Sequence, residues 1–318
     1  MSEGRTLQIE QTNTIAEGVV ELVLVDRSGA KLNEWSAGAH IDLVLPSGLV
    51  RQYSLCGDPS DLRSYRIAVL KEPNGRGGST EIHANLHVGM PILTRGPRNH
   101  FELVEADDYI LIAGGIGVTP IMVMALELVR RRKPWVLHYG GRTIRSMAYL
   151  NELRALSGEF THFVPQDECG LLNLDLIFSQ ATQETAVYCC GPEALLTAVL
   201  ARADRLSSAD LLHIERFSAP AAEPTSIGEN AAFEVELQRS GITLIVPPSK
   251  SLLDVIKEFT PDVMYACEEG YCGSCEATVL EGIPDHRDSF LSKSEKERGK
   301  TMMLCVGRSL TPKLVLDL

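Results

Sequence analysis

Four cysteines near the end of the chain have the spacing of iron–sulfur ligands. Cys267, Cys272 and Cys275 form the pattern C-x4-C-x2-C, and Cys305 follows at a distance. Plant-type 2Fe–2S sites use this arrangement, in which one loop wraps the cluster and a remote strand supplies the last thiolate. The glycines between the cysteines suit a tight loop whose backbone N–H groups point at the sulfur atoms. The spacing therefore predicts a 2Fe–2S cluster with these four ligands.

Two other uses of the cysteines are weaker. Structural zinc sites usually pair two C-x2-C motifs or add histidines, and neither occurs here. A disulfide framework is unusual in a chain of 318 residues whose N-terminus resembles no secretory signal. The remaining cysteines show no disulfide pattern, so we expect a reducing, cytoplasmic location.

A glycine-rich turn in the middle of the chain is a second candidate site. The segment Gly114-Gly-Ile-Gly-Val-Thr-Pro120 follows an apolar run and opens a helical stretch, where backbone N–H groups can meet a pyrophosphate. An ordinary tight turn is about as good an explanation of the glycines alone. The segment 190–193, Cys-Gly-Pro-Glu, ends another strand at the same sheet edge and favours the nucleotide site. The predicted nicotinamide-site residues are Gly115, Gly117, Arg142, Cys190, Gly191 and Pro192.

The dinucleotide fingerprint is incomplete. No Asp or Glu follows the strand that ends at Tyr139, where a carboxylate would hold a ribose hydroxyl. Arg142 lies there instead and could stack on adenine or meet a phosphate. These residues leave NADH and NADPH both open.

Two segments of the first hundred residues could bind a flavin. Arg51-Gln-Tyr-Ser-Leu55 offers a guanidinium, an aromatic ring and a hydroxyl. Taken alone, it is better explained as a surface cross-strand pair. The glycine cluster 74–80 could hold phosphate through its backbone N–H groups, or could simply be a flexible hairpin loop.

The elements that would position these residues change character along the chain. Short alternating stretches at 19–25, 41–45 and 65–70 favour an antiparallel barrel or sandwich. From about Asp107, continuous apolar runs alternate with helical patterns, which is typical of a parallel sheet. The predicted elements are strands 109–113, 135–139, 186–190 and 211–217, and helices 120–132, 147–156 and 193–206. A Pro- and Ala-rich segment at 218–232 predicts a linker.

Composition excludes other classes. A formal charge of −12 argues against nucleic acid as a partner. No apolar run approaches the length that spans a bilayer, so we expect no membrane insertion.

The motifs together resemble the phthalate dioxygenase reductase family, which includes the vanillate O-demethylase reductases. The carriers of the resemblance, in order, are Arg-x-Tyr-Ser-Leu, Gly-Gly-Ile-Gly-x-Thr-Pro, Cys-Gly-Pro and the ferredoxin cysteines. The resemblance implies a multidomain chain. Its parts are an antiparallel β-barrel flavin domain (1–104), an α/β parallel-sheet nicotinamide domain (105–222), a linker (223–232) and an α+β plant-type ferredoxin domain (233–318).

The resemblance also implies FMN as the flavin and NADH as the donor. Ser54 would hydrogen-bond near flavin N5 and Cys190 would pack near nicotinamide C4, which makes these two the predicted catalytic residues. The residues that the resemblance places at the flavin are Arg51, Gln52, Tyr53, Ser54, Ala68, Val69, Leu70, Gly77, Gly78, Ser79, Thr80, Thr119 and Phe217.

The three sites are chemically consistent as a set. Hydride transfer moves two electrons, a 2Fe–2S cluster accepts one, and a flavin can stand between them. The resemblance implies the reductase component of a two-component Rieske non-haem iron oxygenase in aromatic catabolism, which we expect to be monomeric. One alternative is a reductase for another acceptor, such as a haem monooxygenase. Another is a ferredoxin-like redox carrier or sensor.

An acidic stretch surrounds three of the cluster ligands. From Glu258 to His286 there are seven acidic residues and no Lys or Arg. The stretch could dock a basic partner or could be a solvated acidic face, and the sequence favours neither.

Overall fold

The computed structural model describes residues 4–156, 160–220, 230–260 and 262–318. These form two compact units, Met1–Arg216 and Phe217–Leu318, which are described separately. Residues 223–229 of the predicted linker lie outside the described residues.

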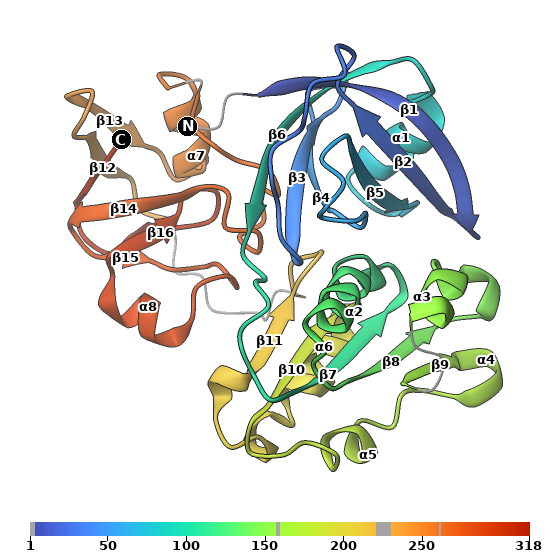
Figure 1. Ribbon diagram of the computed structural model, residues 1–318. Coiled ribbons are helices and arrows are strands. Elements are labelled where there is room, and N and C mark those ends of the chain that lie inside the picture. Colours follow the sequence, from blue (N-terminus) through green and yellow to red (C-terminus); the bar gives the residue numbers. More distant parts are fainter. Residues whose placement is uncertain (1–3, 157–159, 221–229, 261) are drawn as a thin grey trace. The chain divides into compact units, whose positions relative to one another are not determined.

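The first unit begins with a six-stranded antiparallel sheet in the order β4-β3-β6-β1-β2-β5. An antiparallel bridge between Leu55 and Ile67 joins its two ends, so the sheet closes into the predicted barrel. Inward-facing apolar residues such as Ile9, Ile41 and Leu43 fill its core. The strands are β1 (Arg5–Ala16), β2 (Val19–Val25), β3 (Ala39–Val44), β4 (Val50–Ser54), β5 (Ser64–Leu70) and β6 (Pro91–Asn99) (Figure 1).

A helix that the sequence did not predict, α1 (Gly78–Asn85), follows the glycine cluster of this barrel. Gly77 precedes it with φ of 84°, a backbone angle that favours glycine. The buried Ile82 and a contact of 2.9 Å between His83 Nε2 and the Val69 carbonyl hold the helix against β5. The glycine cluster is therefore an ordered turn into a helix rather than a flexible hairpin loop.

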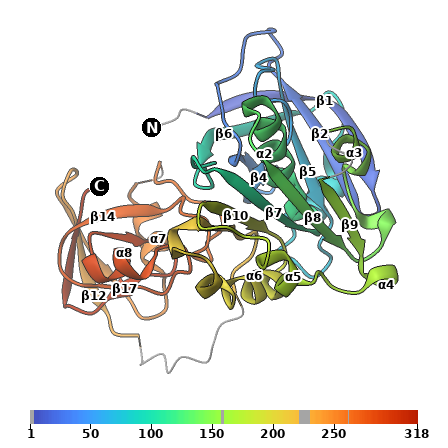
Figure 2. The same ribbon diagram turned by 60° about the horizontal axis from the view of Figure 1, so that its bottom comes forward.

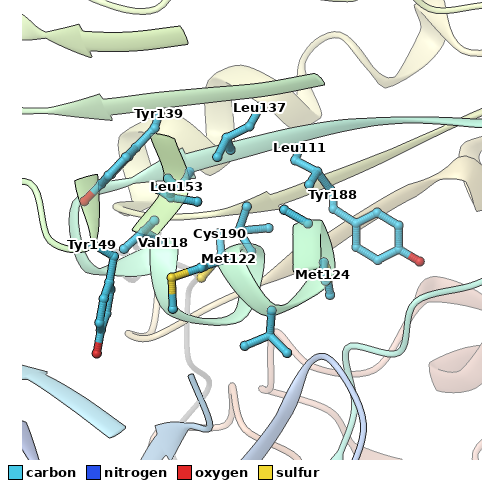
Figure 3. Packing of buried hydrophobic residues seen from close by; sticks show 14 of the residues in the cluster. Leu111, Val118, Met122, Met124, Leu137, Tyr139, Tyr149, Leu153, Tyr188 and Cys190 are labelled. Carbon is cyan, nitrogen blue, oxygen red and sulfur yellow. The ribbon is translucent and has the colours of Figure 1, made fainter. Parts of the chain in front are cut away.

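The second half of the first unit is a five-stranded parallel sheet in the order β11-β10-β7-β8-β9. Its strands are β7 (Asp108–Gly114), β8 (Trp135–Gly141), β9 (Thr161–Pro165), β10 (Thr185–Cys190) and β11 (Leu212–Glu215). The helices are α2 (Val118–Arg131), α3 (Leu150–Leu156), α4 (Gln166–Cys169), α5 (Leu174–Phe178) and α6 (Glu193–Leu200). Apolar residues of α2, including Met122 and Met124, pack on one sheet face with Leu111 and Leu137 (Figure 3). The predicted α/β domain is confirmed.

Several elements of this domain differ from the sequence prediction, which included neither α4 nor α5 and extended the last strand to residue 217 instead of Glu215. Helix α3 starts at Leu150, because Tyr149 has φ of 60° and cannot continue a right-handed helix. Helix α6 ends at Leu200 instead of residue 206, and a 3-10 turn follows at Ala203–Arg205. Strand β9 was not predicted, since its sequence Thr-His-Phe-Val-Pro neither alternates regularly nor forms a continuous apolar run.

The second unit contains a mixed five-stranded sheet in the order β13-β12-β18-β14-β16. Figure 2 shows β12 and β14 of this sheet together with helices α7 and α8. Strands β12 and β18 pair in parallel and the other pairs are antiparallel. Capping boxes begin both helices, one at Ser251 and one at Ser292. The elements are β12 (Phe233–Leu237), β13 (Ile242–Val246), α7 (Leu252–Lys257), β14 (Glu276–Glu281), β15 (Pro284–Asp285), α8 (Lys293–Arg298), β16 (Thr301–Met303), β17 (Arg308–Ser309) and β18 (Lys313–Leu316). This is the predicted α+β domain.

Candidate functional site

The four predicted cluster ligands come together in the second unit. Cys267, Cys272 and Cys275 lie on the loop between α7 and β14, and Cys305 follows β16. All four side chains are buried. The Cys267 thiol is within hydrogen-bonding distance of Cys272 and Cys305, and Cys275 is within that distance of Cys305. The fold thus brings the remote fourth cysteine to the loop, as the spacing predicted.

Backbone N–H groups surround these sulfur atoms. The amide of Glu269 donates to Cys267 Sγ at 3.3 Å. Further amides point at Cys267 from Tyr271 and at Cys272 from Ser274. The contacts with neighbouring thiols, reinforced by these amides, lower the pKa of Cys267, while the same thiol contacts raise the pKa of Cys272 and Cys305. The backbone N–H groups aimed at the sulfur atoms are the feature that suits a cluster ligand, because such hydrogen bonds stabilise a thiolate.

Two glycines of the loop lie where a side chain could not fit. Gly270 has φ of 73°, and a Cβ there would lie 2.6 Å from Val306 Cγ2. Gly273 has φ of 78°, and a Cβ there would lie 2.5 Å from the Phe290 ring. Among the described residues, no group of three His, Cys, Asp or Glu side chains is arranged so that it could hold a single metal ion. A two-iron cluster differs, since it spreads four thiolates over two irons. The loop and its sulfur atoms fit such a cluster.

Arg51 on β4 lies against the start of α1. Its Nη1 and Nη2 donate to the carbonyls of Val50 and Arg76 at 2.8 and 3.1 Å. A Cβ on Gly78 would lie 2.7 Å from Arg51 Cγ, so only glycine lets the guanidinium pack on the first helical turn. A cation beside the N–H groups of a helix N-terminus suits a phosphate. This end of the barrel fits the phosphate of a flavin mononucleotide.

The neighbouring residues of the predicted phosphate loop have different surroundings. Gly77 and Thr80 border an open surface depression of about 780 Å³. The Ser79 hydroxyl instead accepts the Glu72 amide at 3.0 Å, which closes the loop. Ser79 therefore has a structural contact that the sequence did not indicate.

The other predicted flavin residues lie on β5, at the start of α2 and at the beginning of the second unit. Ala68 and Val69 on β5 are buried, and Leu70 is half-buried. Thr119 at the start of α2 is buried, and its hydroxyl donates to the Ile116 carbonyl at 3.0 Å. Phe217 is 37% exposed and begins the second unit.

At the end of β4, Ser54 meets a carboxylate that sequence reasoning missed. Ser54 Oγ donates to Glu215 Oε2 at 3.4 Å, and Cys190 Sγ lies 4.0 Å from the same oxygen. Gln52, one of the predicted contacts, lies on the same strand with its Nε2 3.2 Å from His40 Nε2. The two predicted catalytic residues thus converge on Glu215 from two different sheets. Glu215 opens the segment Glu-Arg-Phe217-Ser, in which only Phe217 was predicted to contact the flavin.

Glu215 should make the stability of the protein depend on pH. Burial raises the pKa of its carboxyl from 4.5 to about 8, against the opposing hydrogen bond from Ser54. Between these values the folded state binds a proton that the unfolded state has released. Glu215 therefore contributes a decrease in the free energy of unfolding as pH rises from about 4.5 to 8, whereas burial lowers the pKa of His40 and His138 and so contributes an increase up to about pH 6.5. Glu215→Gln should remove the Glu215 contribution from the pH dependence measured in denaturant titrations of the holoprotein, whereas Glu297→Gln on exposed α8 should leave that dependence unchanged. If the free energy of unfolding changed with pH in the same way in all three proteins, Glu215 would not have a raised pKa in the folded state.

The predicted nucleotide glycines divide into two kinds. A Cβ on Gly117 would lie 2.3 Å from the Cys190 carbonyl oxygen, and one on Gly191 would lie 2.9 Å from Gly114 Cα. These residues let the two turns pack backbone against backbone at the carboxyl edge of the sheet. Gly115 has φ of 54° with no atom within 4 Å of a Cβ, so its backbone is open to a ligand.

The remaining predicted nucleotide residues flank this edge. Pro192 precedes α6 and lies against Gly114. Arg142 is exposed just beyond β8 and could reach an adenosine. Cys190 is fully buried, so its thiol faces Glu215 rather than open solvent. The edge fits a nicotinamide dinucleotide best around Gly115.

Comparison with known proteins agrees with this geometry. Residues 111–200 match the oxidoreductase NAD-binding domain family, and residues 235–309 match the 2Fe-2S iron-sulfur cluster binding domain family. The chain is 42% identical over 312 residues to phenoxybenzoate dioxygenase subunit beta of Ectopseudomonas oleovorans, and the match covers 96% of each chain.

Two solved structures are similar over nearly the whole chain. Phthalate dioxygenase reductase is 34% identical with a TM-score of 0.73, and the match covers 99% of this chain and 98% of that one. An intact type IV self-sufficient cytochrome P450 monooxygenase is 41% identical with a TM-score of 0.89. That match covers 99% of this chain but spans only 41% of the P450 chain.

The fold, the four-thiol loop and the glycine edge define an NAD(P)H-dependent flavin and iron–sulfur oxidoreductase. A flavin and a 2Fe–2S cluster are its cofactors and NADH is its donor. The chain belongs to the phthalate dioxygenase reductase family, as its motifs predicted. No helix in the described part of the chain is long and apolar enough to cross a membrane.

Proposed function

We propose that this chain is the reductase component of a two-component Rieske non-haem iron oxygenase. The observation that carries the proposal is the union in one chain of a flavin barrel, a nicotinamide edge and a four-thiol loop. A relative named as a dioxygenase subunit matches over 96% of its own length, which supports an oxygenase as partner. We further propose a monomeric cytoplasmic protein with domains at 1–104, 105–222 and 233–318.

The residues have distinct roles in this function. When bound, the flavin accepts hydride from NADH and passes single electrons to the cluster. Arg51 and the first turn of α1 hold the phosphate, and the β5 segment 68–70 lies along the ring edge. Ser54 orients the reacting edge through its hydroxyl, while Glu215 and Cys190 shape the adjoining nicotinamide pocket. The buried loop around Cys267 keeps water from the cluster sulfurs.

A haem monooxygenase as acceptor is the second candidate. The similarity to the self-sufficient cytochrome P450 favours it, because that protein carries a similar segment together with a monooxygenase. The two candidates share the chemistry from NADH to the cluster and differ only in the acceptor.

Anaerobic reduction of the purified holoprotein tests the proposal. NADH should bleach the flavin and cluster absorbance, and denaturation should release FMN on chromatography. Reduced protein should then transfer electrons to a Rieske-type oxygenase at least about tenfold faster than to a haem monooxygenase. The opposite preference would support the second candidate. A holoprotein that NADH does not reduce would instead indicate a carrier or sensor.

Docking to the oxygenase should depend on the acidic stretch near the cluster. Three of its seven acids already have cationic partners, since Glu258 pairs with Lys250, Glu268 with Lys257 and Asp285 with Arg287. These ion pairs neutralise part of the negative charge that the sequence of the stretch indicated.

Charge reversal at Glu276 tests that dependence, because this exposed residue directly follows Cys275. Glu276→Lys should slow electron transfer to the oxygenase about three- to tenfold at low salt, and less as salt rises. Reduction by NADH should not change. Glu234→Lys makes the same charge change on β12, which β18 separates from β14, and serves as the control. Transfer rates that ignore both salt and Glu276→Lys would indicate a solvated face without a docking role.

A further inference from the structure

A buried polar contact joins the flavin barrel to the nicotinamide sheet within the first unit. Tyr149, which precedes α3, donates from its hydroxyl to Glu21 Oε2 on β2 at 2.9 Å. The same hydroxyl lies 3.2 Å from Cys56 Sγ, just beyond β4. All three residues are buried. One tyrosine of the nicotinamide half thus binds two segments of the flavin half.

Contacts within the flavin barrel fix the positions of Glu21 and Cys56, the two partners of Tyr149. Asn13 donates to Glu21 Oε1 at 3.4 Å, and Arg66 Nε lies 3.5 Å from Glu21 Oε2. The Cys56 amide and thiol both lie near the Arg66 carbonyl, at 2.9 and 3.4 Å. Burial raises the pKa of Tyr149 far above its usual range, so the hydroxyl keeps the proton that it donates. The flavin half therefore presents a preformed acceptor.

Tyr149 itself adopts a backbone that is costly for a tyrosine. Its φ is 60°, in the left-handed region that non-glycine residues rarely occupy. Such strain persists where surrounding contacts compensate for it, and it is common near functional sites. In Figure 3 the Tyr149 side chain points away from the strands of the parallel sheet.

The contact lies beside the proposed flavin residues. Glu21 is directly opposite Ala68 in the pairing of β2 with β5, and Cys56 is two residues beyond Ser54. A second contact across the same boundary is nearby, where the Glu17 amide donates to the Arg145 carbonyl at 2.9 Å. A shift of Tyr149 would therefore move the nicotinamide half relative to the strands that hold the flavin.

We propose that Tyr149 is a positioning residue, which sets the hydride-transfer geometry by tying the nicotinamide half to Glu21 and Cys56 of the flavin barrel. The inference rests on the proposed function, since it concerns hydride transfer from NADH to the flavin. A displacement of about 1 Å between reacting groups can cost up to hundredfold in rate. Removing a hydroxyl that is not itself among the proposed flavin or NADH contacts should then change the rate of hydride transfer and leave the binding of flavin and NADH unchanged.

Tyr149→Phe in the holoprotein tests the proposal, because it keeps the ring and removes the donor. The rate of flavin reduction at saturating NADH should fall about tenfold, with flavin content and the dissociation constant of NADH unchanged. Hydrogen exchange at the Glu17 amide, which bonds across the same boundary, should rise about tenfold, since the variant loses the buried hydrogen bond from Tyr149 to the Glu21 carboxylate. Exchange at the Leu32 amide, which donates to Leu62 within the barrel at 2.7 Å, should stay the same.

Tyr65→Phe is the matched control. Tyr65 is buried, and its hydroxyl donates to the Asn33 carbonyl at 2.8 Å entirely within the barrel. A similar fall in flavin reduction with Tyr65→Phe would overturn the proposal, as would an unchanged rate with Tyr149→Phe. A change confined to the dissociation constant of NADH would also overturn it.

Glu21→Gln provides an independent approach from the other side of the contact, and it serves alone if Tyr149→Phe does not fold. Its effect and that of Tyr149→Phe should be non-additive in the double variant. Additive effects would mean that the two residues act separately. Absence of flavin reduction in the unaltered protein would refute the proposed function. Hydrogen exchange at the Glu17 amide would still show whether Tyr149 holds the two halves of the first unit together.

Discussion

Cys272→Ser is expected to abolish electron delivery to the oxygenase while sparing the reduction of flavin by NADH. The side chain is buried in contact with the Cys267 thiol, and the Ser274 amide points at its sulfur. Changes to groups that merely support a metal ligand cost about ten- to hundredfold in metal affinity or activity, so loss of a ligand should cost at least that much. The 2Fe–2S absorbance should disappear and electron transfer should fall roughly hundredfold or more.

The same variant separates the two halves of the proposed electron path. Stopped-flow measurement should show the flavin bleached by NADH at nearly the unaltered rate, since the thiol loop lies in the second unit. Cys169→Ser changes an exposed cysteine of the nicotinamide half and should keep both cluster and transfer. A Cys272→Ser protein with full cluster absorbance and full transfer would show that the ligand assignment is wrong.

Arg51→Ala is expected to weaken the retention of FMN. The guanidinium lies on the first turn of α1, where it would meet the flavin phosphate through a charge-assisted hydrogen bond. Such a bond is worth about 1.5–3 kcal/mol, which corresponds to roughly ten- to hundredfold in the dissociation constant. Flavin fluorescence released during dialysis gives the measurement, and added FMN should restore activity because the barrel core is untouched.

Arg63→Ala supplies the control for this change. Arg63 belongs to the same barrel and its amide donates to Asp61, but it lies outside every flavin segment proposed here. It should retain flavin as the unaltered protein does. If Arg51→Ala kept its FMN through dialysis equally well, the arginine would be only a cross-strand surface residue, which is the simpler explanation of the motif.

The sequence alone was sufficient to predict a 2Fe–2S cluster. Three cysteines at a fixed local spacing, with glycines where the loop requires positive φ, define most of such a site within ten residues. Alternating and continuous apolar runs predicted the antiparallel barrel and the parallel sheet, because they distinguish antiparallel from parallel strands. The family resemblance of the motifs implied the α+β ferredoxin domain. The sequence did not predict short elements such as α1 and β9, since their residues show no clear apolar periodicity.

Only the tertiary structure revealed contacts between residues distant in the chain. Ser54 and Glu215 are 161 residues apart, and Tyr149 and Glu21 are 128 apart, so no local spacing rule predicts either contact. Likewise, Gly117 and Gly191 have a packing role that no turn motif indicates. The physical reason is that spacing rules describe one loop, strand or helix, whereas burial, pKa and hydrogen bonding depend on which distant elements pack together.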